Sequence, residues 1–249
     1  MEDEHQIIEK AKNSFNNALS VPAYTDMLKD DEHLKSIINS LRIKTNGSVL
    51  DLGTGTGYIA FPLAKLFPEC DITGLDLANS VITENNKKAV KERLSNLHFI
   101  SYDGVSFPFE HQFFNNIVTR YALHHFPNID KTFSYLCNMV ESNGQIFISD
   151  PVPDENDEER IIDKYMNVKD DGHVKFYTQN EYESLLQKHG FELDTLFYTD
   201  MHIAFPVRDD YLQITSTVNN KIQESYDIRI IDYRVHLRLK ILNISFLKR

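Results

Sequence analysis

Val49-Leu50-Asp51-Leu52-Gly53-Thr54-Gly55-Thr56-Gly57, a run inside a chain of 249 residues, is the stretch that most narrowly limits the fold and the function. Its first four residues suit a strand that is covered on both faces. Three alternating glycines follow, and the next apolar residues recur at helical spacing. They are Ile59, Ala60, Leu63, Ala64 and Phe67. A strand, a glycine turn and a helix place free N–H groups and the positive end of a helix beside a small molecule.

The glycine spacing separates two classes of ligand. Dinucleotides are bound by G-x-G-x-x-G, whereas this chain has G-x-G-x-G and places Tyr58 at the position of the third glycine. Asp51 lies at the tip of an apolar strand, where its carboxylate would repel a pyrophosphate and attract a cation. S-adenosylmethionine carries two cationic groups, a sulfonium and an ammonium, and only one carboxylate, so the ligand itself has a net positive charge. The stretch therefore favours S-adenosylmethionine over NAD, and a tight turn without a ligand stays open as the alternative.

Two further acidic residues follow expected strands. Asp76 ends a strand over 71–76, and an acid at that position can accept hydrogen bonds from the hydroxyls of an adenosine ribose. The alternative role of Asp76 is to cap the helix expected over 79–93. Asp103 follows a strand over 97–101, where its carboxylate would accept from an adenine amino group or form a simple Asp-Gly turn.

The order of the expected elements predicts the fold. Strands alternate with helices up to residue 150, which is typical of a doubly wound, mostly parallel sheet. Such sheets bind ligands at the carboxyl ends of their strands. The polar residues expected at that edge are Asp51, Asp76, Asp103, Tyr121 and Asp150. We expect one domain over 1–249, with its cofactor-binding half over 45–150.

The two ends of the chain add to this half. Residues 1–44 predict a helical arm, with a first helix ended by Pro22 and a second helix capped by Asp30 or Asp31. Tyr24 lies between them and either packs on the edge of the domain or folds over a cofactor. The apolar face of the first helix is formed by Ile7, Ile8, Ala11, Phe15 and Leu19.

The pattern breaks after Asp150. Residues 151–178 and 200–232 are expected to form a small helical cap that binds the substrate, on either side of a strand over 192–198. Thr178 and Glu181 have the spacing of a capping box that starts a helix. The alternation over 237–246 indicates an antiparallel last strand.

Composition limits the partners and the compartment. The chain has 37 acidic and 26 basic residues and a net charge of −11, which disfavours tight binding to nucleic acid. It contains no apolar run long enough to span a membrane. Two cysteines and an acidic N-terminus without an apolar run predict a reducing, cytoplasmic location. A small-molecule acceptor is the expected partner, no metal site is expected, and a homodimer is left open.

Four segments together resemble a known family. They are Val49–Gly57, Ile72–Asp76, Asp103–Phe109 and Thr119–Phe126. These segments are similar to those of the class I S-adenosylmethionine-dependent methyltransferases, in the small-molecule branch that includes the ubiquinone and menaquinone C-methyltransferases. Phe107-Pro108-Phe109 resembles the Leu-Pro-Phe of that branch, and Arg120–Phe126 resembles its segment after the fourth strand. Val105 departs from the family pattern, which commonly has Glu there, and Asn115 departs from Asp.

The resemblance implies a Rossmann-like α/β fold with a seven-stranded sheet, helices on both faces and an antiparallel last strand. It implies S-adenosylmethionine as the methyl donor. The residues expected to bind this cofactor are Asp51, Gly53, Thr54, Gly55, Gly57, Tyr58, Asp76, Leu77, Asp103, Gly104 and Tyr121.

Methyl transfer needs position, a dry pocket and, for a hydroxyl or an acidic carbon, a base. His124, His125 and His173 are the candidate bases, and we select His125 and His173 as catalytic residues. The alternative for His125 is a capping or packing role, and for His173 a surface loop. Aromatic residues of the cap would suit a flat or apolar acceptor or would belong to its core. They are Tyr165, Phe176, Tyr177, Tyr198 and Phe205.

The predicted function is methylation of a small molecule (EC 2.1.1.-) by S-adenosylmethionine. Three other functions stay open: an RNA or protein methyltransferase of the same fold, a non-catalytic relative that binds S-adenosylmethionine, and a nicotinamide-dependent oxidoreductase. Tyr58 and Asp51 count against the last of these.

Overall fold

A computed structural model describes residues 3–18, 29–109 and 111–249. The expected roles of Leu19, Pro22 and Tyr24 lie outside the described residues. The first helix, α1, spans Glu4–Ala18, and α3 spans Asp31–Ser40. The Asp30 carboxylate accepts a hydrogen bond from the His33 amide at 3.0 Å, so Asp30, one of the two caps that the sequence left open, is the N-cap of α3.

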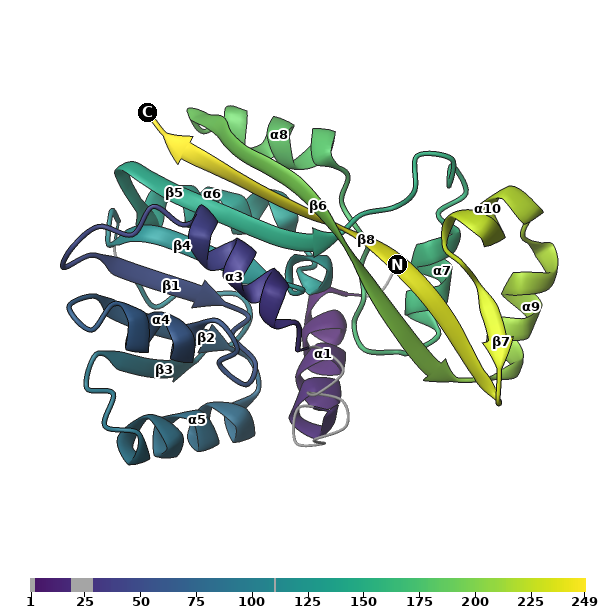
Figure 1. The fold of residues 1–249 in the computed structure, drawn as a ribbon, viewed down its shortest axis with the longest axis horizontal. Coiled ribbons are helices and arrows are strands. Elements are labelled where there is room, and N and C mark those ends of the chain that lie inside the picture. Colours follow the sequence, from purple (N-terminus) through teal and green to yellow (C-terminus); the bar gives the residue numbers. More distant parts are fainter. Residues whose placement is uncertain (1–2, 19–28, 110) are drawn as a thin grey trace.

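One mixed sheet organises the molecule (Figure 1). Its strands are β1 Ser48–Leu52, β2 Asp71–Asp76, β3 Leu97–Ser101, β4 Phe114–Arg120, β5 Val140–Pro151, β6 Phe191–Pro206, β7 Arg229–Ile231 and β8 Arg234–Lys248. The order is β3-β2-β1-β4-β5-β8-β6, and β7 pairs with β8 outside this path. The first five strands run parallel, and β8 runs antiparallel to both β5 and β6.

The predicted doubly wound sheet with an antiparallel last strand is therefore confirmed, with one correction to the number of strands. The described part of the chain forms eight strands and not seven, because the short β7 adds to the edge of β8. The sequence did not predict β7, whose three residues are all exposed and carry no alternating pattern of burial.

Helices cover both faces of the sheet. The helices between and after the central strands are α4 Ala60–Leu66, α5 Asn79–Lys91, α6 Ile129–Met139 and α8 Gln179–Gln187. One hydrophobic core includes Leu50 of β1 with residues of α6 and α8, and the other includes Val49 with residues of α3, α4 and α5. Successive residues of β1 point to opposite faces, so each face is closed by its own layer of helices.

The cap is built on the far ends of β6 and β8, which extend beyond the rest of the sheet (Figure 1). It contains α7 Ile161–Asn167, α9 Asp209–Thr217 and α10 Asn220–Ser225. Their buried residues form a third hydrophobic core together with Ile203 of β6 and Leu237 of β8. The strand expected over 192–198 continues to Pro206, so residues 200–206 belong to the sheet.

Phe246 of β8 tests how strongly the antiparallel strand holds the sheet together. Its side chain is fully buried in the core under α6 and α8. Phe246→Ala is expected to lower the free energy of unfolding by about 3–5 kcal/mol, because it removes buried apolar contacts and leaves a cavity. Denaturant titration followed by circular dichroism measures the change. Tyr233→Ala is the control, since Tyr233 is 87% exposed and its loss should cost less than about 0.5 kcal/mol. Equal losses in both variants would contradict this view of the core.

Candidate cofactor and acceptor site

The glycine turn after β1 is held by the neighbouring strand. The amides of Gly53 and Thr54 both donate to the carbonyl of Leu75, at 2.8 and 3.1 Å. Gly53 has φ 69°, and a Cβ atom there would lie 2.4 Å from the Cβ atom of Ala122. Only glycine suits this position. The turn therefore packs directly on the segment that follows β4.

Asp76 joins the turn to the end of β2. Its Oδ2 atom accepts from the amide of Gly55 at 2.8 Å, and its Oδ1 atom accepts from the amide of Ala78 at 2.9 Å. A carboxylate oxygen can accept more than one hydrogen bond, so both oxygens of Asp76 can still accept a hydrogen bond from a ligand. Burial raises the pKa of Asp76, and the backbone donors act in the opposite direction. Ala78 and not Asp76 is the N-cap residue of α5, and it makes no side-chain cap.

Asp51 is the second acid at this edge, and its side chain is buried. Its Oδ2 atom accepts from the hydroxyl of Thr54 at 2.7 Å and from the amide of Ala60 at 3.2 Å. Burial raises its pKa to about 7, and the charge of Asp76 acts in the same direction. The cation of Arg120 already acts in the opposite direction, and a cationic ligand nearby would likewise favour the ionised carboxylate. The site is therefore suited to a positively charged group.

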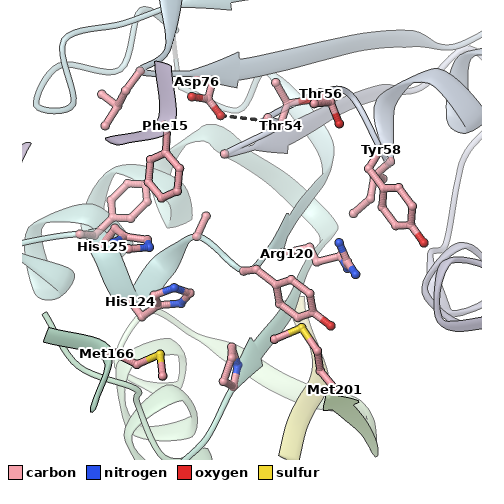
Figure 2. A pocket seen from close by; sticks show the side chains of 18 of the residues that line it. Phe15, Thr54, Thr56, Tyr58, Asp76, Arg120, His124, His125, Met166 and Met201 are labelled. Carbon is pink, nitrogen blue, oxygen red and sulfur yellow. Dashed lines mark hydrogen bonds between the residues drawn. The ribbon is translucent and has the colours of Figure 1, made fainter. Parts of the chain in front are cut away.

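A single pocket connects this edge of the sheet to the cap (Figure 2). It encloses about 1350 Å³ of empty space, part of which is open solvent. Asp76 and Thr54 lie on one side of the pocket, Met166 and Met201 lie on the opposite side, and Arg120, His124 and His125 lie between them. The side formed by the cap and the extended strands is lined by Met166, Lys169, Phe176, Met201, Ile203, Phe205 and Leu239. We call this side the acceptor chamber.

Most of the residues expected to bind a cofactor meet in this pocket. Those that line it are Asp51, Gly53, Thr54, Gly55, Tyr58, Asp76, Leu77 and Tyr121. Gly57, Asp103 and Gly104 do not line it. A Cβ atom on Gly57 would lie 2.6 Å from the ring of Phe61, so this glycine allows close packing of α4.

The loop after β3 is organised by its own backbone. Oδ1 of Asp103 accepts from the amides of Val105 and Ser106, at 2.8 and 2.7 Å, and these bonds lower its pKa. The geometry is that of the Asp-Gly turn that the sequence left open. Gly104 has φ 85°, and a Cβ atom there would lie 2.9 Å from the side chains of Ile8 and Leu77. This glycine allows α1 to approach the loop.

The three candidate histidines differ in their surroundings. His125 lines the pocket, and its ring lies 4.9 Å from that of Phe15 of α1. His173 does not line the pocket, and its Nε2 atom lies 2.8 Å from Oδ1 of Asp163. It is only 8% exposed, so the surface-loop alternative for His173 is wrong. His124 lines the pocket, and its Nδ1 atom lies 2.9 Å from Oδ1 of Asp150.

Sequence reasoning gave no role to Arg120, which ends β4 and lines the pocket. Its guanidinium group lies 4.5 Å from the ring centre of Tyr58 and 3.9 Å from that of Tyr121. Stacking on two aromatic rings holds the cation between the two sides of the pocket (Figure 2). The only feature of the sequence that could have indicated a role for Arg120 was its place in the segment Arg120–Phe126, which resembles a family motif.

The cap residues in the pocket were predicted only in part. Phe176 and Phe205 line the acceptor chamber. Tyr165 and Tyr177 belong to hydrophobic cores, and Tyr198 is exposed. Met166 and Met201 were missed, because methionine at helical or strand spacing reads as ordinary core.

Among the residues that the structure describes, no group of three or more His, Cys, Asp or Glu side chains is placed to hold a metal ion. None of the described helices has the length and apolarity that crossing a membrane requires.

Comparison with known proteins gives the family. A methyltransferase domain matches residues 28–196. The chain is 24% identical over 176 residues to YcgJ, an uncharacterized methyltransferase of Bacillus subtilis, over 69% of this chain and 66% of that protein. It is 26% identical over 164 residues to the ubiquinone/menaquinone biosynthesis C-methyltransferase UbiE of Brucella canis, over 57% and 61% of the two chains. The matches thus span less than two thirds of the length of these relatives.

Solved structures agree on the fold. YcgJ superposes with a TM-score of 0.79 at 19% identity, over 88% of this chain and 99% of that chain. The geranyl diphosphate C-methyltransferase of Streptomyces coelicolor, solved with Mg²⁺, geranyl diphosphate and S-adenosyl-L-homocysteine, superposes with a TM-score of 0.71 at 13% identity, over 98% of both chains. With the domain match covering residues 28–196, this chain belongs to the methyltransferase domain family, in agreement with the class I S-adenosylmethionine-dependent methyltransferases that its four segments resemble.

Proposed function

We propose that this protein transfers a methyl group from S-adenosylmethionine to a small, largely apolar molecule held in the acceptor chamber. The observation that carries the proposal is the continuous pocket, which has Asp76 and the glycine turn on one side and the apolar lining of the cap on the other. A donor and an acceptor bound on these two sides would face each other across Arg120, His124 and His125.

The residues present fit the cofactor. Asp76 would accept from the ribose hydroxyls, because its carboxylate is fixed by the amides of Gly55 and Ala78 and keeps acceptor capacity. Asp51 supplies negative charge for the cationic methionine part. When bound, S-adenosylmethionine supplies a methyl group that is already activated by the sulfonium. Gly53 and Gly55 keep the backbone of the turn free of side chains.

The chain's own contribution is position and exclusion of water. The lining of the acceptor chamber includes the buried side chains of Phe176, Ile203 and Leu239. Apolar surface of this kind stabilises an apolar molecule and strengthens electrostatic interactions inside the pocket. Holding an acceptor in line with an activated methyl group contributes much of the rate of such a displacement.

Two observations support a small-molecule acceptor over RNA. The net charge of −11 opposes approach of a phosphate backbone. The acceptor chamber is walled by the cap and lined mainly by apolar side chains, which suits a molecule that enters the pocket as a whole. The related fold that was solved with geranyl diphosphate accommodates an acceptor with an apolar chain.

Calorimetric titration with S-adenosylhomocysteine and, separately, with NAD tests the cofactor. We expect micromolar binding of S-adenosylhomocysteine and no heat with NAD. Binding of NAD alone would overturn the interpretation of the glycine turn, and no response to either compound would favour a non-catalytic relative.

Asp76→Ala tests the ribose contact. The variant should bind S-adenosylhomocysteine roughly 10- to 100-fold more weakly, because a charge-assisted contact contributes about 1.5–3 kcal/mol. Asp71→Ala is the matched control, since Asp71 lies exposed at the other end of β2. A thermal melt verifies that both variants fold. Unchanged affinity in a folded Asp76→Ala protein would remove Asp76 from the site.

Ile203→Trp tests the acceptor chamber separately from the cofactor side. The larger side chain would fill the chamber, so we expect S-adenosylhomocysteine affinity to change less than twofold while methyl transfer in an acceptor screen falls at least tenfold. Ala204→Trp is the control, because the neighbouring residue points to the other face of β6 and does not line the pocket. Equal methyl transfer in wild type and Ile203→Trp would place the acceptor elsewhere, as on an RNA or protein substrate that docks outside.

A further inference from the structure

A chain of three buried side chains leads to the wall of the pocket. His124 lies in the short 3₁₀ helix Leu123–His125 after β4, Asp150 lies near the end of β5, and Tyr182 lies in α8. Nδ1 of His124 is 2.9 Å from Oδ1 of Asp150, and the hydroxyl of Tyr182 donates to Oδ2 of the same carboxylate at 3.2 Å. Both oxygens of Asp150 are therefore engaged by side chains.

The arrangement engages one of the two ring nitrogens of His124 with a carboxylate. Asp150 occupies Nδ1, and the backbone carbonyl of His124 accepts from the amide of Val174 at 2.8 Å. The Asp150 side chain is 1% exposed and that of His124 is 11% exposed, so the imidazole is the member of the pair that reaches the pocket. Nε2 is the ring nitrogen left for a ligand. A carboxylate behind the opposite nitrogen favours a proton on Nδ1 and a free lone pair on Nε2.

The neighbouring histidines lack this combination. His173 has its carboxylate, Asp163, on Nε2 but does not line the pocket. His125 lines the pocket, but its buried Nδ1 atom has no hydrogen-bond partner among the described residues. A base needs both a route to the substrate and a group that orients it. Of the three, His124 meets both conditions.

Burial is the main reason that His124 is neutral at pH 7. Burial lowers its pKa well below 6.5, and the neighbouring His173 and Lys169 act in the same direction. The carboxylates of Asp171 and Asp163 act in the opposite direction. On the other side of the pair, burial raises the pKa of Asp150, whereas the charge of His125 and the hydrogen bonds from the Tyr182 hydroxyl and the His124 amide oppose that rise and favour the carboxylate. A neutral imidazole has the lone pair that proton abstraction requires.

On the basis of the function proposed above, we propose that His124 is the general base of the reaction, that Asp150 is its positioning residue, and that the acceptor is an apolar molecule methylated on a hydroxyl group. The O–H bond of the acceptor breaks as its proton passes to Nε2 of His124. An oxygen electron pair forms the bond to the methyl carbon, and the electrons of the carbon–sulfur bond remain on sulfur. The products are a methyl ether and S-adenosylhomocysteine, and the imidazolium returns its proton to solvent.

The chamber explains why a hydroxyl needs this base. Apolar surroundings raise the pKa of a hydroxyl group, so its spontaneous ionisation becomes rarer than in water. A neutral amine already carries the nucleophilic lone pair, and its proton is lost only after transfer. A buried carboxylate–imidazole pair beside an apolar chamber is therefore better matched to oxygen than to nitrogen.

Nitrogen-15 NMR of the ligand-free protein, labelled at histidine, tests the geometry without any acceptor. We expect His124 at pH 7 to be neutral, with its proton on Nδ1 and none on Nε2. The resonance is assigned by its loss in His124→Asn. A proton on Nε2, or an imidazolium at pH 7, would overturn the proposal. Asp150→Asn should shift the tautomer or the pKa of His124 if the carboxylate positions it.

Methyl transfer from labelled S-adenosylmethionine to 1-naphthol and to 1-naphthylamine tests the acceptor class. His124→Asn keeps an N–H toward Asp150 and removes Nε2, so it should lower transfer to the naphthol by about 10²–10⁴-fold with S-adenosylhomocysteine affinity unchanged within twofold. His98→Asn, at an exposed position of β3, is the control. Methylation of the amine alone, or full activity of His124→Asn, would overturn the proposal. If neither probe is methylated, the NMR measurement of the His124 tautomer decides whether the proposal stands. A wild-type protein that does not bind S-adenosylhomocysteine would instead contradict the proposed function.

Discussion

The carboxylate of Asp76 accepts one hydrogen bond from the amide of Gly55 and another from the amide of Ala78, and the rest of the site depends on this arrangement. The two bonds tie the turn after β1 to the end of β2. Because the turn lies against Ala122, its position also sets where the segment after β4 runs. That segment carries His124 and His125 into the pocket. A displacement of Asp76 would therefore move both the glycine turn and the segment that carries the two histidines.

The second half of the pocket has a different structural origin. β6 and β8 extend past the parallel strands, and the helices of the cap pack on their free ends (Figure 1). The strands place Ile203 and Leu239 on one wall of the pocket, and the cap places Met166 and Phe176 on it. A shared parallel sheet therefore accounts for the cofactor side, whereas the antiparallel extension accounts for the acceptor side. This division fits a family in which the fold is common and the acceptors differ.

The cofactor side was predictable from sequence because its signals are local. The strand before the glycines and the acid at the end of β2 depend on residues near one another in the chain, and the structure has both. The capping box of Thr178 and Glu181, at the start of α8 and outside this side of the pocket, was predictable for the same reason. His33 shows the limit of such reasoning. It lies in a helix that was predicted, but its buried ring contacts Asn243 at 2.8 Å, far away in the sequence.

The acceptor side was less predictable because its geometry arises from contacts between distant segments. The pairing of β6 with β8 up to Pro206 requires the last strand to be in place. The contact between His124 and Asp150 depends on the parallel alignment of β4 and β5, and no local pattern distinguishes it from the neighbouring His125. The carboxylate of Asp103 engages its own turn through a short-range bond that competes with any longer-range role.

A crystal structure of the protein with S-adenosylhomocysteine bound would test the central claim most directly. The account predicts that the ribose hydroxyls lie within hydrogen-bond distance of Asp76 and that the sulfur faces the acceptor chamber, on the side where His124 lies. A nucleoside bound away from Asp76, or a sulfur directed away from the chamber, would contradict it.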